Sequence, residues 1–179
     1  MIYILHVHSG YEHQTAQLLR RTISLRKTDA HVYSLDRELR IRKGGKRHIV
    51  KQPLYSGYIF VETSLPAHEL PGLIKPIQTA VRFLPSNSDC KPLTENEESF
   101  IRRFIHFGGT LPRSRVKLIP GQAIQVIDGP LQGLEGIIQR IDKRRERVKI
   151  RLEMSDRPFV FDLGIELVKE AESRVENTV

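Results

Sequence analysis

The sequence predicts an α+β protein with a larger first domain of antiparallel strands and helices, followed by a small all-β domain. Over roughly the first hundred residues, apolar runs with strand character alternate with segments of helical periodicity. After residue 117, five short apolar runs are separated by Gly, Pro, Asp or charged turns. The chain has 179 residues, 39% of them hydrophobic, which is enough to form a core in each part.

The first half begins with a strand over residues 2–7 that is rich in β-branched and aromatic side chains. Capping-box spacing from Ser9 to Glu12 predicts a helix ending near Arg26, with Tyr11, Leu18 and Leu19 on one face. The later elements are a hairpin turning at Gly44-Gly45, strands over 55–63 and 81–84, a short helix over 66–75, and a helix opened by the Thr94–Glu97 capping box. This split βαβ order predicts a ferredoxin-like domain over residues 1–105.

The composition changes at residue 106. Residues 106–117 contain Gly-Gly, Pro and three basic residues without a period, which predicts a flexible linker. The five apolar runs that follow (124–127, 134–141, 148–152, 159–163 and 165–168) predict an SH3-like β-barrel within residues 118–170. Residues 171–179 form a polar tail.

The charge balance predicts an anionic partner, because the chain carries a formal net charge of +8. A single cysteine, the lack of a signal peptide and the lack of a long apolar run predict a cytoplasmic monomer without membrane contact. We expect no enzyme: a phosphate loop would need glycine where Arg40 stands, no other catalytic motif is present, and Cys90 has no adjacent base.

The most specific motif is a set of turn residues before Ile137. Taken singly, each has a structural explanation as a turn, a position with positive φ or a point of close approach. Their joint spacing resembles the KOW motif. The residues are Gly121, Asp128, Gly129, Pro130, Gly133 and Gly136.

A second resemblance lies in the first half. Ser9-Gly10-Tyr11-Glu12, the run PLYSGYIFV over 53–61 and Val81-Arg82-Phe83-Leu84 resemble the N-terminal domain of NusG-family transcription elongation factors. With the KOW segment, the resemblance covers about residues 1 to 170. Ile2 replaces the family's tryptophan and Ser56 weakens its central glycine-proline pattern, so the chain is more similar to LoaP-type antiterminators than to the general factor.

The resemblance implies a protein without a cofactor that binds the clamp helices of the largest subunit of bacterial RNA polymerase. It places the polymerase-binding aromatic patch on Tyr58 and Phe60, with Tyr55 adjoining. Strand alternation puts Tyr58 and Phe60 on one face and Tyr55 on the other, so one set must be core. The alternative is that Tyr58 and Phe60 are themselves core residues.

Two basic regions predict nucleic-acid contacts. Residues 143–151 carry a net charge of +5 over nine residues, which favours binding of a nascent RNA hairpin, although a solvated hairpin is the alternative. The residues are Lys143, Arg144, Arg145, Arg147, Lys149 and Arg151, together with Arg157 in the next turn. By resemblance, His8, Arg20 and Arg21 face non-template DNA; solubility alone is the other explanation for the arginines.

We therefore expect a specialised elongation and antitermination factor that binds elongating RNA polymerase and nascent RNA. Two other functions fit the same residues. One is a general NusG factor whose KOW domain binds Rho or a ribosomal protein. The other is a ribosome-associated KOW protein that binds RNA.

Overall fold

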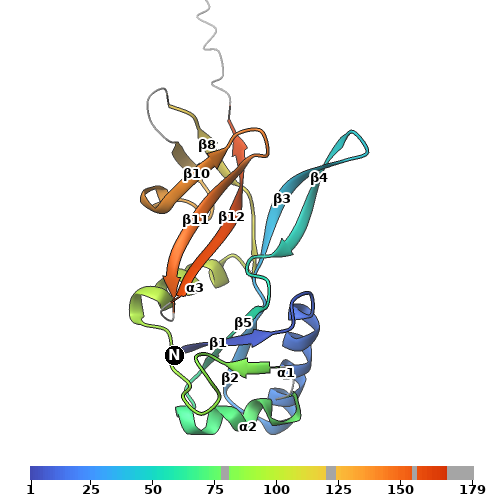
Figure 1. Ribbon diagram of the computed structural model, residues 1–179, viewed down its shortest axis with the longest axis vertical. Helices are drawn as coiled ribbons and strands as arrows, with labels where there is room; N and C mark the ends of the chain where they lie inside the picture. The colour runs from blue at the N-terminus through green and yellow to red at the C-terminus, as the bar shows by residue number, and fades with distance from the viewer. Residues whose placement is uncertain (78–80, 120–123, 155–156, 169–179) are drawn as a thin grey trace, which may run out of the picture.

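The computed structural model describes residues 1–77, 81–119, 124–154 and 157–168 (Figure 1). The first domain lies at one end of the long axis, and the barrel lies at the other, beside a projecting hairpin. The prediction of an α+β fold, with an antiparallel sheet and helices followed by a small β-barrel, is confirmed.

The first domain is built on an antiparallel sheet with the strand order β2-β5-β1-β6. The strands are β1 (Ile2–Val7), β2 (Ala30–Tyr33), β5 (Tyr58–Thr63) and β6 (Val81–Phe83). The helices are α1 (Glu12–Arg26), α2 (Leu70–Ile74) and α3 (Glu95–His106), with short 3-10 turns η1 (Ala67–Glu69) and η2 (Lys75–Ile77). Strand β2 was not predicted, because its four residues, AHVY, show too short an apolar pattern.

The two faces of this sheet belong to different cores. Successive side chains of a strand point to opposite faces, and Tyr3, Leu5 and Val7 of β1 pack in one apolar cluster with residues of α1 and α2. Ile2 and Ile4 point to the other face and pack in the cluster that contains residues of α3 and of the barrel. The barrel is therefore packed against the face of the sheet that α1 leaves free.

The helix starts differ from one another. In α3 the predicted capping box is confirmed: the Thr94 hydroxyl accepts from the Glu97 backbone N–H, and the Glu97 carboxylate accepts from the Thr94 N–H at 2.7 Å. In α1 the predicted capping box is wrong. Its N-cap is Tyr11 without a side-chain bond, and Glu12 is buried instead.

The predicted apolar face of α1 is right for Leu19 and wrong for Tyr11 and Leu18. The helix buries Ala16, Leu19 and Ile23, whereas Tyr11 and Leu18 are exposed. The face is set by what the sheet can cover, and the small side chain of Ala16 allows α1 to lie close to it. Tertiary packing has here decided between two possible stripes.

A separate hairpin projects from the first domain. Strand β3 (Asp36–Lys43) pairs with β4 (Lys46–Pro53), and the turn is the predicted Gly44-Gly45, whose φ values of 58° and 77° are both positive. Two positive φ values match the twist of a two-residue hairpin, which explains the two glycines.

The predicted linker, residues 106–117, contains two short strands. Strand β7 (Thr110–Leu111) pairs in parallel with β3, and β8 (Ser114–Lys117) pairs with two later strands of the barrel. The barrel therefore begins four residues earlier than the expected residue 118. The composition of this segment did not predict the two strands, because each pairs with a strand that is distant in the sequence.

The barrel sheet has the strand order β10-β11-β12-β8-β9. Its remaining strands are β9 (Gln125–Asp128), β10 (Ile138–Asp142), β11 (Arg147–Met154) and β12 (Arg157–Leu167), with a 3-10 turn η3 (Glu135–Ile137) before β10. The two predicted strands 159–163 and 165–168 are one strand, β12, because Gly164 continues the strand and does not turn it. The predicted tail, residues 171–179, lies outside the described residues.

A substitution at Phe60 tests the packing of the two domains. It is 2% exposed and belongs to the apolar cluster that contains residues of both domains. Phe60→Ala should lower the free energy of unfolding by about 3–5 kcal/mol, the usual cost of truncating a buried aromatic ring. Urea denaturation measures this change, with Val160→Ala, 41% exposed on β12, as the control. We expect less than about 0.5 kcal/mol for the control, and an equally small loss at Phe60 would contradict its burial.

Candidate functional site

Aromatic residues of both domains share one apolar cluster where the barrel contacts the first domain. We call this set the aromatic seam: Tyr55, Tyr58, Phe60, Phe104, Phe159 and Phe161. Tyr55 stacks on Phe159 with ring centroids 4.2 Å apart and planes 25° apart, and Tyr58 lies 5.4 Å from the same ring. Phe161 meets Phe104 of α3 edge to face at 6.2 Å. The barrel thus covers the sheet face predicted to bind polymerase.

The structure places all three predicted aromatic residues together, which corrects the expectation for Tyr55. Its ring lies 5.1 Å from that of Tyr58, on the same side and not on the opposite face. The reason is that β5 begins only at Tyr58, and Gly57, with φ +84°, turns the chain before the strand alternation starts. Phe60 is buried, whereas Tyr55 and Tyr58 are half-buried, and burial raises the pKa of Tyr55.

Glu12 holds the loop that presents Tyr55 and Tyr58. Its carboxylate is 1% exposed and accepts hydrogen bonds from the backbone N–H of Gly57 at 2.6 Å and of Gly10 at 3.0 Å. Burial alone raises the pKa of Glu12, but these backbone donors outweigh it, so the pKa lies below its ordinary value. The charged form of Glu12 is therefore part of the folded structure.

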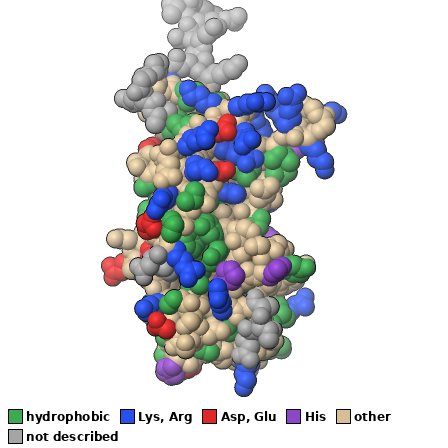
Figure 2. Space-filling view, viewed as in Figure 1, with side chains coloured by type: hydrophobic (Ala, Val, Ile, Leu, Met, Phe, Trp, Pro, Cys, Tyr) green, Lys and Arg blue, Asp and Glu red, His purple; other side chains and the backbone are tan. Residues whose placement is uncertain are grey.

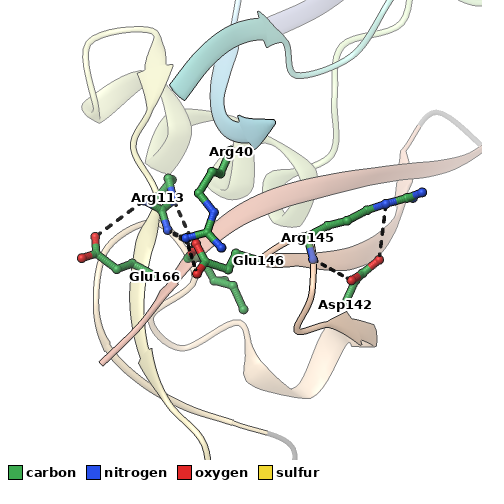
Figure 3. Close-up of polar contacts among 7 residues, drawn as sticks. Arg40, Arg113, Asp142, Arg145, Glu146 and Glu166 are labelled. Atoms are coloured by element: carbon green, nitrogen blue, oxygen red, sulfur yellow. Dashed lines mark hydrogen bonds and ion pairs between the residues drawn. The ribbon is translucent and has the colours of Figure 1, made fainter. Parts of the chain in front are cut away.

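An ion-pair group joins the same two domains on another side of the contact (Figure 3). Glu146, at the end of the β10–β11 turn, is buried and has a positive φ of 52°. Its carboxylate forms an ion pair with Arg40 of β3 at 2.6 Å and accepts a hydrogen bond from Arg113, just before β8, at 2.5 Å. Arg113 also donates to the carbonyl of Ile165 in β12. Removing Glu146 would leave two largely buried guanidinium groups without their shared carboxylate, which is costly.

Gly164 allows the closest approach of the two domains. A Cβ atom built at this residue would collide with the backbone carbonyl of Glu38 in β3 and would lie 2.8 Å from Cγ of Arg113. Next to it, Arg37 of β3 donates to the carbonyl of Asp162 at 2.5 Å. A residue with any side chain at position 164 would therefore push β12 away from the hairpin.

The seven basic residues predicted to bind RNA divide into a cluster of five and two residues that lie apart from it. Lys143, Arg144 and Arg145 are exposed in the β10–β11 turn, and Arg147 and Lys149 follow on the outer face of β11. Figure 2 shows Lys and Arg side chains gathered over the end of the molecule that holds the barrel and the projecting hairpin. These five residues form the surface that the charge pattern predicts for RNA.

The structure does not bring Arg157 to that cluster. It begins β12 and pairs with Met154, about seven residues along β11 from Arg147, or roughly 20 Å at the usual rise of a strand. There it is close enough to His6 of the first domain to contribute, after burial and Arg82, to lowering the pKa of His6. Arg151 lies between these ends and is ion-paired with Glu153 at 2.6 Å.

The predicted DNA-facing residues are exposed but are not gathered into one cluster. His8 follows β1 and lies 5.3 Å from the ring of Tyr11, whereas Arg20 and Arg21 lie in the second half of α1. The Arg20 guanidinium donates to the carbonyl of Val32 at 2.9 Å. This contact gives Arg20 a structural role independent of nucleic acid.

The turn residues of the KOW motif serve the barrel itself. Gly129, with φ +104°, follows Asp128 and lies so close to Ser114 that a Cβ would be 2.8 Å away. Gly133 also has a positive φ, of 74°. Pro130 lies in the same turn, Gly136 has open space around it, and Gly121 lies outside the described residues.

Among the described residues, no group of three His, Cys, Asp or Glu side chains could hold a metal ion. Burial, followed by the neighbouring Asp89, raises the pKa of the Cys90 thiol, which makes it a weaker nucleophile. No helix within the described ranges is long and apolar enough to cross a membrane.

The fold defines a two-domain protein: an α+β domain with an aromatic sheet face, joined to a β-barrel with a basic turn. The family model described as "Transcription termination factor nusG" matches residues 2–102. The chain belongs to the NusG family.

Named relatives match over nearly the whole chain. The transcription termination/antitermination protein NusG of Xylella fastidiosa strain Temecula1 is 25% identical, over 94% of this chain and 98% of its own length. The protein of the same name from Escherichia coli K12 is 24% identical, over 94% and 95%. A solved structure described as "Domain interaction in Thermotoga maritima NusG" has the same fold, with a TM-score of 0.56, 22% identity, and coverage of 92% of this chain and 93% of that chain.

The pH dependence of stability tests the role of Glu12. A carboxylate whose native pKa lies below its unfolded value adds stability at neutral pH and loses it as the pH falls through the native pKa. We therefore expect the free energy of unfolding of the native chain to fall more steeply below about pH 4.3, the ordinary Glu pKa, than that of Glu12→Gln. Urea denaturation at pH 7, 4 and 3 measures both. Parallel pH profiles would show that the charge of Glu12 contributes nothing.

Proposed function

We propose that the protein is a specialised transcription elongation and antitermination factor. Its first domain binds the clamp helices of RNA polymerase, its barrel binds a nascent RNA hairpin, and His8 and Arg21 lie on the side that faces non-template DNA. The observation that carries the proposal is the aromatic seam on a NusG-family domain. Tyrosine supplies apolar area and a hydroxyl, the combination common at the centre of protein interfaces.

Polymerase binding through this face requires the barrel to move. Phe159 stacks on Tyr55 and contacts Tyr58, and Phe60, in the same apolar cluster, is 2% exposed. A helical partner cannot reach these rings while Phe159 and Phe161 cover them. The docked arrangement therefore competes with polymerase for one surface.

The basic turn of the barrel supports the RNA part of the proposal. Lys143, Arg144 and Arg145 are exposed, and clustered cations bind phosphates with release of counterions. A barrel that mainly binds protein partners, as in the general-factor alternative, does not require this charge.

Removing one ring from each side of the aromatic seam tests the polymerase surface. Tyr58→Ala removes a ring from the polymerase side and should weaken polymerase binding by about 30-fold, the effect of losing about 2 kcal/mol at an interface centre. Phe159→Ala removes the ring that covers it and should strengthen binding up to about tenfold, since an aromatic pair contributes about 0.5–1.5 kcal/mol. The full-length variants are compared by biolayer interferometry on immobilised core polymerase, with circular dichroism as the control for folding.

The two variants break the same ring contact, so a purely structural role would change binding in the same direction for both. Weaker binding by both variants would contradict the proposal. In a transcription assay, the native chain should increase read-through of terminators. Stimulation of Rho-dependent termination would favour the general factor, and co-purification with ribosomal subunits in place of polymerase would favour the ribosomal alternative.

A further inference from the structure

A groove lined almost entirely by arginine lies between the two domains. It has a volume of about 540 Å³ and runs between the β3–β4 hairpin of the first domain and the β10–β11 turn of the barrel. Six of its seven lining residues are arginines, and no acidic or aromatic residue is among them. The lining residues are Arg40, Ile41, Arg42, Arg47, Arg144, Arg145 and Arg147.

The groove holds like charges together at a cost. Arg42 and Arg47 are direct cross-strand partners in the hairpin, an arrangement that is destabilising when no anion separates the charges. On the barrel side, Arg140 is likewise paired with Lys149. Within the described ranges, Arg42, Arg47 and Arg144 have no ion-pair partner. The other three lining arginines are paired with carboxylates: Arg40 with Glu146, Arg145 with Asp142 and Arg147 with Asp162. Among the described residues, the unpaired charges of the groove therefore come from both hairpins.

The chemistry of the lining indicates a phosphate backbone. Guanidinium groups bind phosphates with two parallel hydrogen bonds. Without an aromatic ring there is no platform for stacked bases, so recognition of the backbone is favoured over recognition of the base sequence. A neighbouring groove shares Arg145 and Arg147 and is lined also by Arg140, Lys149, Asp142 and Asp162. Four of its six lining residues are basic, so the two grooves together suit an extended polyanion better than a single nucleotide.

We propose that this groove is a composite binding site for the phosphate backbone of a structured RNA, complete only while the two domains are docked. The inference rests on the proposed function for its RNA-binding barrel and extends it to the β3–β4 hairpin of the first domain. RNA bound across both hairpins stabilises the docked state. By thermodynamic reciprocity, release of the barrel from the aromatic seam weakens RNA binding.

The test measures the affinity of the full-length chain for a fluorescently labelled RNA hairpin across a range of salt concentrations. Arg42→Gln combined with Arg47→Gln should weaken binding by about tenfold or more and flatten the log–log salt slope by about 1.4 to 1.8, since each lost phosphate contact removes about 0.7 to 0.9. Lys43→Gln combined with Lys46→Gln is the matched control. It removes the same charge from the tip of the same hairpin, outside the groove, and should change the slope by less than half as much.

A third variant separates docking from charge. Gly164→Val should prevent the approach of β12 to β3 and weaken RNA binding without removing a charge, whereas Gly136→Ala, in open space, should leave it unchanged. Circular dichroism confirms that Gly164→Val keeps its fold; if it does not, the arginine pair alone decides the outcome. Duplex DNA of the same sequence and inorganic pyrophosphate serve as competitors, and displacement of RNA by micromolar pyrophosphate would show a small-anion site instead.

The outcomes distinguish the two proposals. No RNA binding by the native chain at low salt would overturn the RNA part of the proposed function and this inference with it. RNA binding that depends on Arg144 and Arg145 but is unaffected by the Arg42 and Arg47 changes would leave the RNA-binding barrel intact and overturn only the composite groove.

Discussion

The stacking of Tyr55 on Phe159 closes a contact that the proposed polymerase binding must open and that the proposed RNA groove requires closed. These rings come from segments about a hundred residues apart, and around them the sheet face of the first domain, α3 and one end of the barrel form one apolar cluster. Each aromatic pair adds only about 0.5–1.5 kcal/mol beyond the burial of its area. The docked state therefore rests mainly on the apolar area buried in this cluster, to which each ring pair adds a smaller contribution.

A polar group on another side of the contact fixes the orientation of the docked barrel. Glu146 forms ion pairs with Arg40 of the first domain and with Arg113 at the start of the barrel. Gly164 allows β12 to lie close to the Glu38 carbonyl. Charged groups of this kind specify geometry more than they add stability. Their placement brings the basic hairpin of the first domain beside the basic turn of the barrel. Docking therefore hides an aromatic surface and assembles an arginine surface in one step.

Much of the fold could be predicted because its signals are local. The Gly44-Gly45 turn and the Thr94 capping box each depend on a few neighbouring residues, and both are confirmed. The errors arise where distant residues decide. Strands β7 and β8 form because β3 and β12 lie beside them. Gly57 turns the chain before β5, so Tyr55 lies on the same side as Tyr58, whereas strand alternation predicts opposite sides. The covering of the seam and the arginine groove join residues of two domains, so no local pattern could have predicted either.

The most direct measurement of the central claim is nuclear magnetic resonance on the full-length chain with selectively labelled Tyr and Phe rings. Docking predicts nuclear Overhauser contacts between the ring protons of Tyr55 and Phe159, whose centroids lie 4.2 Å apart. It also predicts that these contacts disappear in Gly164→Val while the contacts inside each domain persist. Ring contacts absent from the native chain, with barrel resonances identical in the native chain and in Gly164→Val, would contradict the account.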